Sequence, residues 1–334
     1  MSENAEIINF IKKTPKAELH LHIEGTLEPE HMFELAKRNN ISIPYNNVEE
    51  VKSAYNFQDL DSFLKIYYQG LKVLMKEHDF FDLTWSYALK CKEDNIVHSE
   101  IFFDPQAHMD RGISFDVIIN GIDKALKKAN LELGLTSKII MCFLRHLDEE
   151  SGFKVLDQAT KYKDKIVGVG LDSSELGNPP KKFEKLFKKA RNEGFLTVAH
   201  AGEEGPPEYI SESINLLKVQ RIDHGIQCLK DDKLVELLKK EQIPLTVCPL
   251  SNVKLCVFDK IENHNLKKML NKGLRVMVNS DDPAYFGGYL NKNLIETQMA
   301  LDLSFEEIKT LIINSFKSSF LDDAKKKEWI EKIY

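Results

Sequence analysis

The stretch Ala17-Glu18-Leu19-His20-Leu21-His22-Ile23-Glu24-Gly25-Thr26 decides the fold. Successive side chains of a β-strand point to opposite faces, so His20 and His22 share one face while Leu19 and Leu21 share the other. The leucine face predicts a strand that packs on an apolar core, and Gly25 permits a sharp exit from it. Two imidazoles on one face are able to share a cation, although the pattern also suits a half-exposed strand with two solvent-facing histidines.

Strand-like segments recur along the chain, and most are separated by amphipathic, helix-like segments. Strands that alternate with helices pair in parallel through right-handed crossovers, and eight such units predict an α/β fold of the (β/α)8 (TIM) barrel type. No linker rich in Pro, Gly or Ser divides the 334 residues, so we expect a single domain over residues 1–334. The expected strands cover residues 17–22, 97–104, 138–145, 166–172, 195–200, 221–225, 244–249 and 274–280.

The segment between the first two expected strands, residues 27–95, is too long for one crossover and predicts a helical insertion. Leu60, Phe63 and Tyr67 form an apolar stripe at helical spacing within it. Such a stripe is either buried core or the wall of a lid, because an insertion at this position lies over the catalytic face of a barrel. The tail, residues 304–334, predicts two C-terminal helices, the first opened by a capping box of Ser304 and Glu307.

Composition excludes several functional classes. A net charge of −6 argues against a nucleic-acid partner, and no apolar run approaches the roughly 18 residues of a membrane span. The five cysteines are scattered without a Cys-x-x-Cys motif, which favours reduced thiols. The polar, acidic start of the chain predicts no signal peptide. We therefore expect a cytoplasmic protein (nuclear localisation being also open in a eukaryote), and the sequence predicts no oligomeric state.

Three expected strands end abruptly at ionisable residues. His200 and Glu203 follow the fifth strand, His224 ends the sixth, and Asp281 and Asp282 follow the eighth. The carboxyl ends of barrel strands converge on one face, and burying ionisable groups costs several kcal/mol unless they are paired or bound to a metal. Together with the two histidines of the first strand, these ends predict a catalytic metal site.

The motifs His20-x-His22, His200-Ala-Gly-Glu203, His224-Gly and Ser280-Asp281-Asp282 resemble the signature of the adenosine deaminase family of metal-dependent hydrolases, in family order. The resemblance implies that the four metal ligands are His20, His22, His200 and Asp281. Imidazole and carboxylate ligands without thiolate suit Zn²⁺, with Fe²⁺ or Mn²⁺ as alternatives. The resemblance also implies that Glu203 donates a proton to purine N1, that His224 acts on the attacking water, and that Asp282 contacts N7.

Residues 102–108, 170–175, 205–209 and 285–289 resemble the adenine deaminase branch of that family, found in bacteria and fungi. The implied reaction is the hydrolysis of the free base adenine to hypoxanthine and ammonia, a step of purine salvage. We expect Glu175 to accept a hydrogen bond from a ring N–H of adenine and to oppose a ribose, the alternative being an exposed loop glutamate. Glu24 is expected at the pocket rim, and Phe63 and Tyr67 match the family's lid helix.

Other substrates and one other class of function stay open from the sequence. Adenosine or an N6-substituted adenine could replace adenine as the substrate, because the sequence does not reveal the depth of the pocket around C6. A non-catalytic zinc- and purine-binding module on the same barrel is a further alternative. Such a module is expected to have lost a ligand or the acid, and this chain retains all of them.

Overall fold

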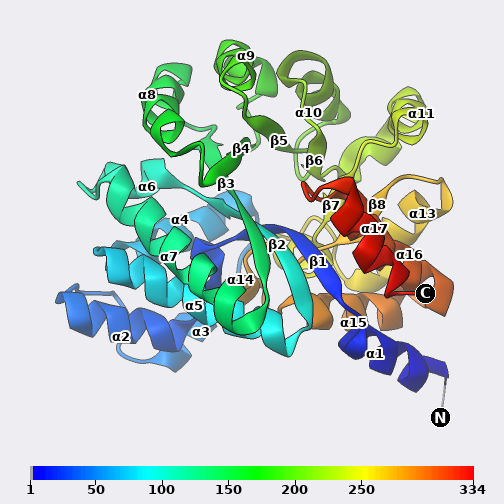
Figure 1. Cartoon of the computed structure of the whole chain (residues 1–334), viewed down its shortest axis with the longest axis horizontal. Coiled ribbons are helices and arrows are strands. Elements are labelled where there is room, and N and C mark those ends of the chain that lie inside the picture. Colours follow the sequence, from blue (N-terminus) through cyan, green and yellow to red (C-terminus); the bar gives the residue numbers. More distant parts are fainter. Residues whose placement is uncertain (1–2) are drawn as a thin grey trace.

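The computed structural model describes residues 3–334 and is built on one sheet of eight parallel strands in sequence order (Figure 1). A parallel bridge between Leu21 of the first strand and Asp281 after the last strand closes the sheet, and the His22 N–H donates to the Asp281 carbonyl at 3.0 Å. The predicted (β/α)8 barrel is thereby confirmed. The strands are β1 (Lys16–His22), β2 (Ile96–Phe103), β3 (Thr136–Leu144), β4 (Ile166–Asp172), β5 (Leu196–Ala201), β6 (Arg221–His224), β7 (Leu245–Val247) and β8 (Val276–Val278).

Strands β7 and β8 are shorter than predicted. Pro244 and Pro249 flank β7, and proline has no N–H to give to a neighbouring strand, so the strand lies between them. After β8 the backbone stays paired, because the Asn279 N–H donates to the Val247 carbonyl and Asp281 bridges to β1. This pairing holds Asp281 and Asp282 in the barrel mouth.

The alternation of β1 places its side chains as the pattern predicts, but both faces are buried. Leu19 and Leu21 are fully buried in the hydrophobic core. His20 is 0% exposed and His22 7%, so the reading of two solvent-facing histidines is wrong. A fully buried pair of imidazoles needs partners inside the barrel.

Helices surround the barrel (Figure 1). Four of them, α2 to α5, lie between β1 and β2, as expected for residues 27–95, and α5 packs along α7. The helices before the tail are α1 (Glu3–Lys13), α2 (Pro29–Asn39), α3 (Val48–Ala54), α4 (Leu60–Gly70), α5 (Glu77–Glu93), α6 (Pro105–Met109), α7 (Phe115–Leu133), α8 (Glu149–Ala159), α9 (Glu184–Asn192), α10 (Pro207–Glu212), α11 (Asp232–Glu241), α12 (Pro249–Lys254), α13 (Leu266–Asn271), α14 (Pro283–Phe286) and α15 (Leu290–Leu301).

The C-terminal segment forms the two predicted helices, α16 (Phe305–Ser318) and α17 (Asp323–Glu331). The Glu307 N–H donates to Ser304 Oγ at 3.3 Å and the Ser304 N–H donates to Glu307 Oε2 at 2.8 Å, which confirms the capping box. Helix α16 packs on β8 and β1, where the barrel closes. Among residues 3–334, no helix combines the length and apolar character that crossing a membrane requires.

Candidate active site

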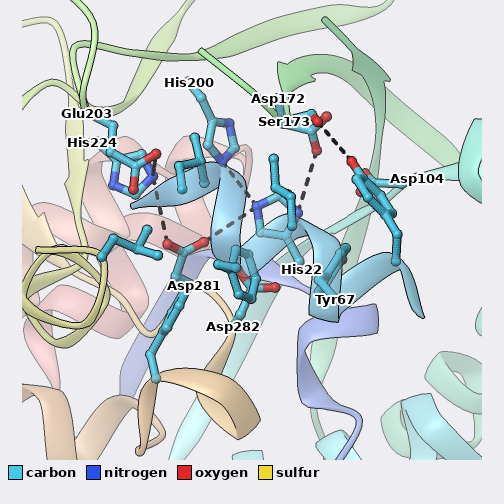
Figure 2. Close-up of a pocket in the computed structure, with 16 residues that line it drawn as sticks. His22, Tyr67, Asp104, Asp172, Ser173, His200, Glu203, His224, Asp281 and Asp282 are labelled. Carbon is cyan, nitrogen blue, oxygen red and sulfur yellow. Dashed lines mark hydrogen bonds and ion pairs between the residues drawn. The ribbon is translucent and has the colours of Figure 1, made fainter. Parts of the chain in front are cut away.

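A pocket lies at the carboxyl ends of the strands, with helix α4 forming part of its wall (Figure 2). Phe63 and Tyr67, both predicted on a lid helix, line the pocket from α4. The polar lining comes from the ends of the strands, as it does in barrel enzymes generally.

The four predicted metal ligands converge in this barrel mouth. His20 Nε2 lies 3.1 Å from Asp281 Oδ1, and His22 Nε2 lies 3.0 Å from His200 Nε2 and 3.5 Å from Asp281 Oδ1. Ligand atoms bound about 2.0–2.2 Å from one zinc ion lie roughly 3 to 3.5 Å from one another. Ligand atoms of His20, His200, His224 and Asp281 all lie within 4.8 Å of one another, and His22 adjoins this group through His200 and Asp281. The imidazoles and the carboxylate, brought together from β1, β5, β6 and the end of β8, therefore offer a site for a divalent cation.

A buried hydrogen-bond network behind His20 fixes the orientation of its ring. His20 Nδ1 lies 2.9 Å from Thr246 Oγ1, and that hydroxyl donates to Asp223 Oδ1 at 2.8 Å. Arg221 pairs with Asp223 at 3.5 Å and with Glu100 at 2.7 Å. Partners of this kind orient a ligand ring and raise its basicity. The network leaves His20 Nε2 directed at Asp281.

Glu203 and His224 stand side by side next to the ligand cluster. Glu203 Oε2 lies 3.5 Å from His224 Nε2, which itself lies 3.8 Å from Asp281 Oδ2. Burial and the negative charge of Asp281 raise the pKa of Glu203 well above its usual value. Burial, aided by the charge of His20, lowers the pKa of His224 to about 3. These shifts favour the protonated form of the Glu203 carboxyl group and the neutral form of the His224 imidazole.

Three residues at the strand ends adopt a left-handed backbone that is uncommon outside glycine. Ser173, His224 and Asp281 have φ of +74°, +67° and +63°. Each such conformation costs on the order of 1 kcal/mol and persists where the surrounding structure enforces it, often at functional sites. All three residues line the pocket.

Asp282 lies in the pocket beside Asp281 and against Gly25, in the turn that follows β1. Its Oδ1 has no hydrogen-bond partner among residues 3–334, and burial followed by the charge of Asp281 raises its pKa well above the usual value. A side chain on Gly25 would collide with the Asp282 carboxyl group. Gly25, predicted to permit a sharp exit from the strand, is therefore required for the close approach of Asp282.

The structure corrects the role expected for Glu175. Its Oε1 accepts the Gly202 N–H at 2.6 Å, and its Oε2 accepts the N–H groups of Glu203, Glu204 and Gly205 at 2.8–3.0 Å. The side chain is 1% exposed and lies outside the pocket lining. Both sequence interpretations, substrate contact and an exposed loop, are wrong because the carboxylate is already occupied by the turn that carries Glu203.

The rim position expected for Glu24 is corrected in the same way. Its Oε1 accepts the Asp104 N–H at 3.0 Å and lies 3.0 Å from His108 Nε2. The residue is fully buried and is not part of the pocket lining. Glu24 therefore supports the segment after β2 from behind.

Helix α4 is attached to two loops of the barrel mouth. Glu204, the neighbour of Glu203, accepts the Leu60 N–H at the start of α4 at 3.0 Å. Ser174 Oγ donates to Asp61 Oδ1 in the first turn of the helix at 2.7 Å. These bonds tie α4 to the loops that follow β4 and β5.

Sequence reasoning missed Asp104, Asp172 and Ser173, which also line the pocket. Asp172 Oδ2 lies 3.6 Å from His22 Nδ1. Burial and the charge of Asp172 raise the pKa of Asp104 well above its usual value. The signal was available, because Asp104 follows β2 and Asp172 ends β4, the same position that identified His200 and Asp281.

A closed (β/α)8 barrel with three histidines and an aspartate converging at the carboxyl ends of its strands defines a metal-dependent hydrolase. The sequence profile described as adenosine deaminase matches residues 15–334, and the chain belongs to the adenosine deaminase family.

Individual relatives are similar over nearly the whole chain. An adenine deaminase of Acinetobacter baylyi is 60% identical over 97% of this chain and 98% of its own. The crystal structure of an adenine deaminase from Arthrobacter aurescens superposes with a TM-score of 0.94 at 48% identity, covering 96% of this chain and 98% of that one. An amidohydrolase from Burkholderia ambifaria with bound Zn superposes with a TM-score of 0.89 at 25% identity, covering 98% and 91%.

Proposed function

We propose that this chain hydrolyses adenine to hypoxanthine and ammonia. The observation that carries the proposal is that Glu203, His224, His22, His200 and Asp281 line one pocket, with His20 beside Asp281, in a chain 60% identical to an adenine deaminase. We further propose that residues 1–334 form one barrel domain in which residues 27–95 are the lid-bearing insertion.

The metal ligands in this proposal are His20, His22, His200 and Asp281. Their nitrogen and oxygen donors suit Zn²⁺, with Fe²⁺ or Mn²⁺ as alternatives. A bound ion of this kind lowers the pKa of its water to about 7 and so supplies a nucleophile at neutral pH.

Glu203 and His224 handle the protons of the reaction. Glu203, kept protonated by burial and by Asp281, donates to purine N1, and a protonated N1 makes C6 more electrophilic. The neutral imidazole of His224 lies 3.5 Å from Glu203 and is able to orient the attacking water and accept its proton. The exocyclic amino group then takes up the proton held by His224 and leaves as ammonia.

Asp282 and the lid position the base. Purine N7 is a hydrogen-bond acceptor, and the raised pKa of Asp282 keeps a proton on that carboxyl group for donation to N7. Phe63 and Tyr67 of α4 cover the pocket and exclude water, which strengthens the polar interactions inside it.

The test is release of hypoxanthine and ammonia by the purified, zinc-loaded chain, with adenine, adenosine and N6-isopentenyladenine as substrates. We expect turnover of adenine, far weaker turnover of the other two, and none by metal-stripped protein. Turnover of adenosine far above adenine would overturn the choice of substrate. Tight purine binding without turnover of any substrate would favour the non-catalytic module instead.

A further inference from the structure

Asp104 and Asp172 form an acidic edge of the pocket that the proposed reaction leaves without a role. Both carboxyl groups are 2% exposed, and with a ring nitrogen of His22 they offer atoms that lie within 4.8 Å of one another. Figure 2 shows them on the side of the pocket away from Glu203 and His224.

The acidic edge has few hydrogen-bond donors. His22 Nδ1, which carries a hydrogen when Nε2 binds the metal, faces Asp172 Oδ2 at 3.6 Å, beyond hydrogen-bond length. Asp104 Oδ1 and both carboxyl oxygens of Asp172 have no hydrogen-bond partner within residues 3–334. Buried polar atoms are nearly always paired, and leaving an acceptor unpaired is unfavourable. The neighbouring Ser173 Oγ lies 2.8 Å from Tyr68 Oη and 2.8 Å from His146 Nδ1, and among the described residues it makes no hydrogen bond to either carboxyl group. The missing donor is therefore expected from a ligand in the pocket.

The orientation of the base leaves one purine edge for these oxygens. With C6 at the ligand cluster, N1 at Glu203 and N7 at Asp282, the edge still unassigned is N3–C4–N9. Free adenine carries one ring N–H there, on N9 or, in a minor tautomer, on N3. A nucleoside carries none, because its ribose replaces the hydrogen on N9.

We propose that Asp104 and Asp172 accept the ring N–H on the N3–N9 edge of an unsubstituted purine base, and that this contact selects free bases over nucleosides and other N9-substituted purines. The inference rests on the proposed function, because it uses the orientation that deamination at C6 requires. A nucleoside loses the hydrogen bond and also brings a sugar against a buried acidic edge.

The expected size of the selection follows from the chemistry of the contact. Sites built to hydrogen-bond a substrate N–H reject analogues without it by up to about 10⁴–10⁵-fold, because their own buried polar groups are left unpaired. A single methyl group on N9 removes the N–H with little added bulk. We therefore expect the wild-type chain to prefer adenine over 9-methyladenine by roughly 100-fold or more in kcat/KM.

The experiment compares kcat/KM for adenine and 9-methyladenine in the zinc-loaded wild type, Asp104→Asn and Asp110→Asn. Asparagine has the size of aspartate but also offers an N–H₂ donor, which suits N3 of either base. In Asp104→Asn we expect adenine turnover to fall roughly 100-fold while 9-methyladenine turnover is held or rises, so the preference collapses. Asp110 is exposed at the end of the same segment, and Asp110→Asn should behave as wild type.

A steric origin of selectivity would leave the preference for adenine intact in Asp104→Asn, and that result would overturn the proposal. Calorimetric titration of the catalytically impaired Glu203→Gln variant measures the binding of adenine and of 9-methyladenine without turnover. We expect adenine to bind more tightly, and equal affinities for the two bases would also overturn the proposal. If the chain binds a second equivalent of zinc and adenine displaces it, the acidic edge is a cation site and the proposal is overturned. Failure of the wild type to deaminate either base would count against the proposed function. The calorimetric comparison would still show whether the acidic edge selects bases that carry the ring N–H.

Discussion

The two sides of the pocket are built differently. On the ligand side, His20 lies 3.1 Å from Asp281, and His22 lies 3.0 Å from His200 and 3.5 Å from Asp281, while Thr246 and Asp223 support His20 from behind. On the acidic edge, Asp104 Oδ1 and both carboxyl oxygens of Asp172 have no hydrogen-bond partner in the described chain. The ligand side is organised before substrate arrives and suits the chemical step. The acidic edge is complete only when a base with a ring N–H is bound, and it suits selection.

Removal of a ligand should have the largest effect on this comparison. His200→Ala removes one of the converging nitrogens, so we expect loss of bound zinc and a fall of ammonia release to the level of metal-stripped protein. Metal analysis and the ammonia assay check this on the same sample. His78→Ala is the matched control, because that side chain is 53% exposed and distant from the pocket lining. Full zinc content in His200→Ala would remove His200 from the ligand set.

Replacement of the acid should separate catalysis from metal binding. Glu203→Gln keeps the shape of the side chain but cannot donate an acidic proton to N1, so we expect kcat to fall by roughly 10²–10⁴-fold with zinc content unchanged. Steady-state kinetics with adenine provides the measurement. A fully active variant would show that Glu203 is not the acid.

The support behind His20 should contribute less. Thr246→Val removes the hydroxyl that lies 2.9 Å from His20 Nδ1 without a large change in volume. Loss of such a supporting partner lowers metal affinity or activity by about 10–100-fold. Zinc affinity measured by competition with a chelator checks this, and an unchanged affinity would mean that His20 does not depend on the network.

We expect the smallest change in kcat from Glu175→Gln. This variant tests whether Glu175 supports the turn that carries Glu203, whereas Asp104 and Asp172 contact the base. The amide is a poorer acceptor for the N–H groups of residues 202–205, so we expect kcat to fall about tenfold, equivalent to one weakened charged hydrogen bond. The ratio of adenine to 9-methyladenine turnover should not change, because Glu175 lies outside the pocket. A lowered ratio would indicate that Glu175 contacts the ring N–H of the base.

The pH profile of Glu175→Gln gives a second reading of the same variant. The charge of Glu175 helps to raise the pKa of Glu203. Activity needs protonated Glu203, so kcat/KM falls as pH rises through that pKa. Removing the neighbouring negative charge lowers the pKa, and the alkaline limb of the profile should move to lower pH. A limb that stays in place would indicate a purely structural role for Glu175.

The sequence predicted the ligand side of the pocket but not its acidic edge. The barrel follows from the alternation of strands and helices, and the ligand set follows from short motifs in which several functional residues lie close together, such as His20-x-His22. Strand-end position alone brought His200 and Asp281 to one face. Asp104 and Asp172 occupy the same strand-end position, after β2 and at the end of β4, but no motif of adjacent functional residues marks them, and sequence reasoning missed them.

The misassigned carboxylates have a common physical cause. Glu24 and Glu175 lie next to functional segments in sequence, and proximity predicted contact with substrate. In the structure, Glu24 accepts the backbone N–H of the pocket residue Asp104, and Glu175 accepts that of the pocket residue Glu203. A carboxylate has the same sequence signature in either role, and only its hydrogen-bond partners distinguish them.

The most direct test of the central claim is anomalous diffraction at the zinc edge from crystals of the zinc-loaded chain. The account predicts one peak within about 2.0–2.3 Å of the Nε2 atoms of His20, His22 and His200 and of an Asp281 carboxyl oxygen. A principal peak between Asp104, Asp172 and His22 Nδ1, or no ordered peak in the barrel mouth, would contradict the division of the pocket into a ligand side and an acidic edge.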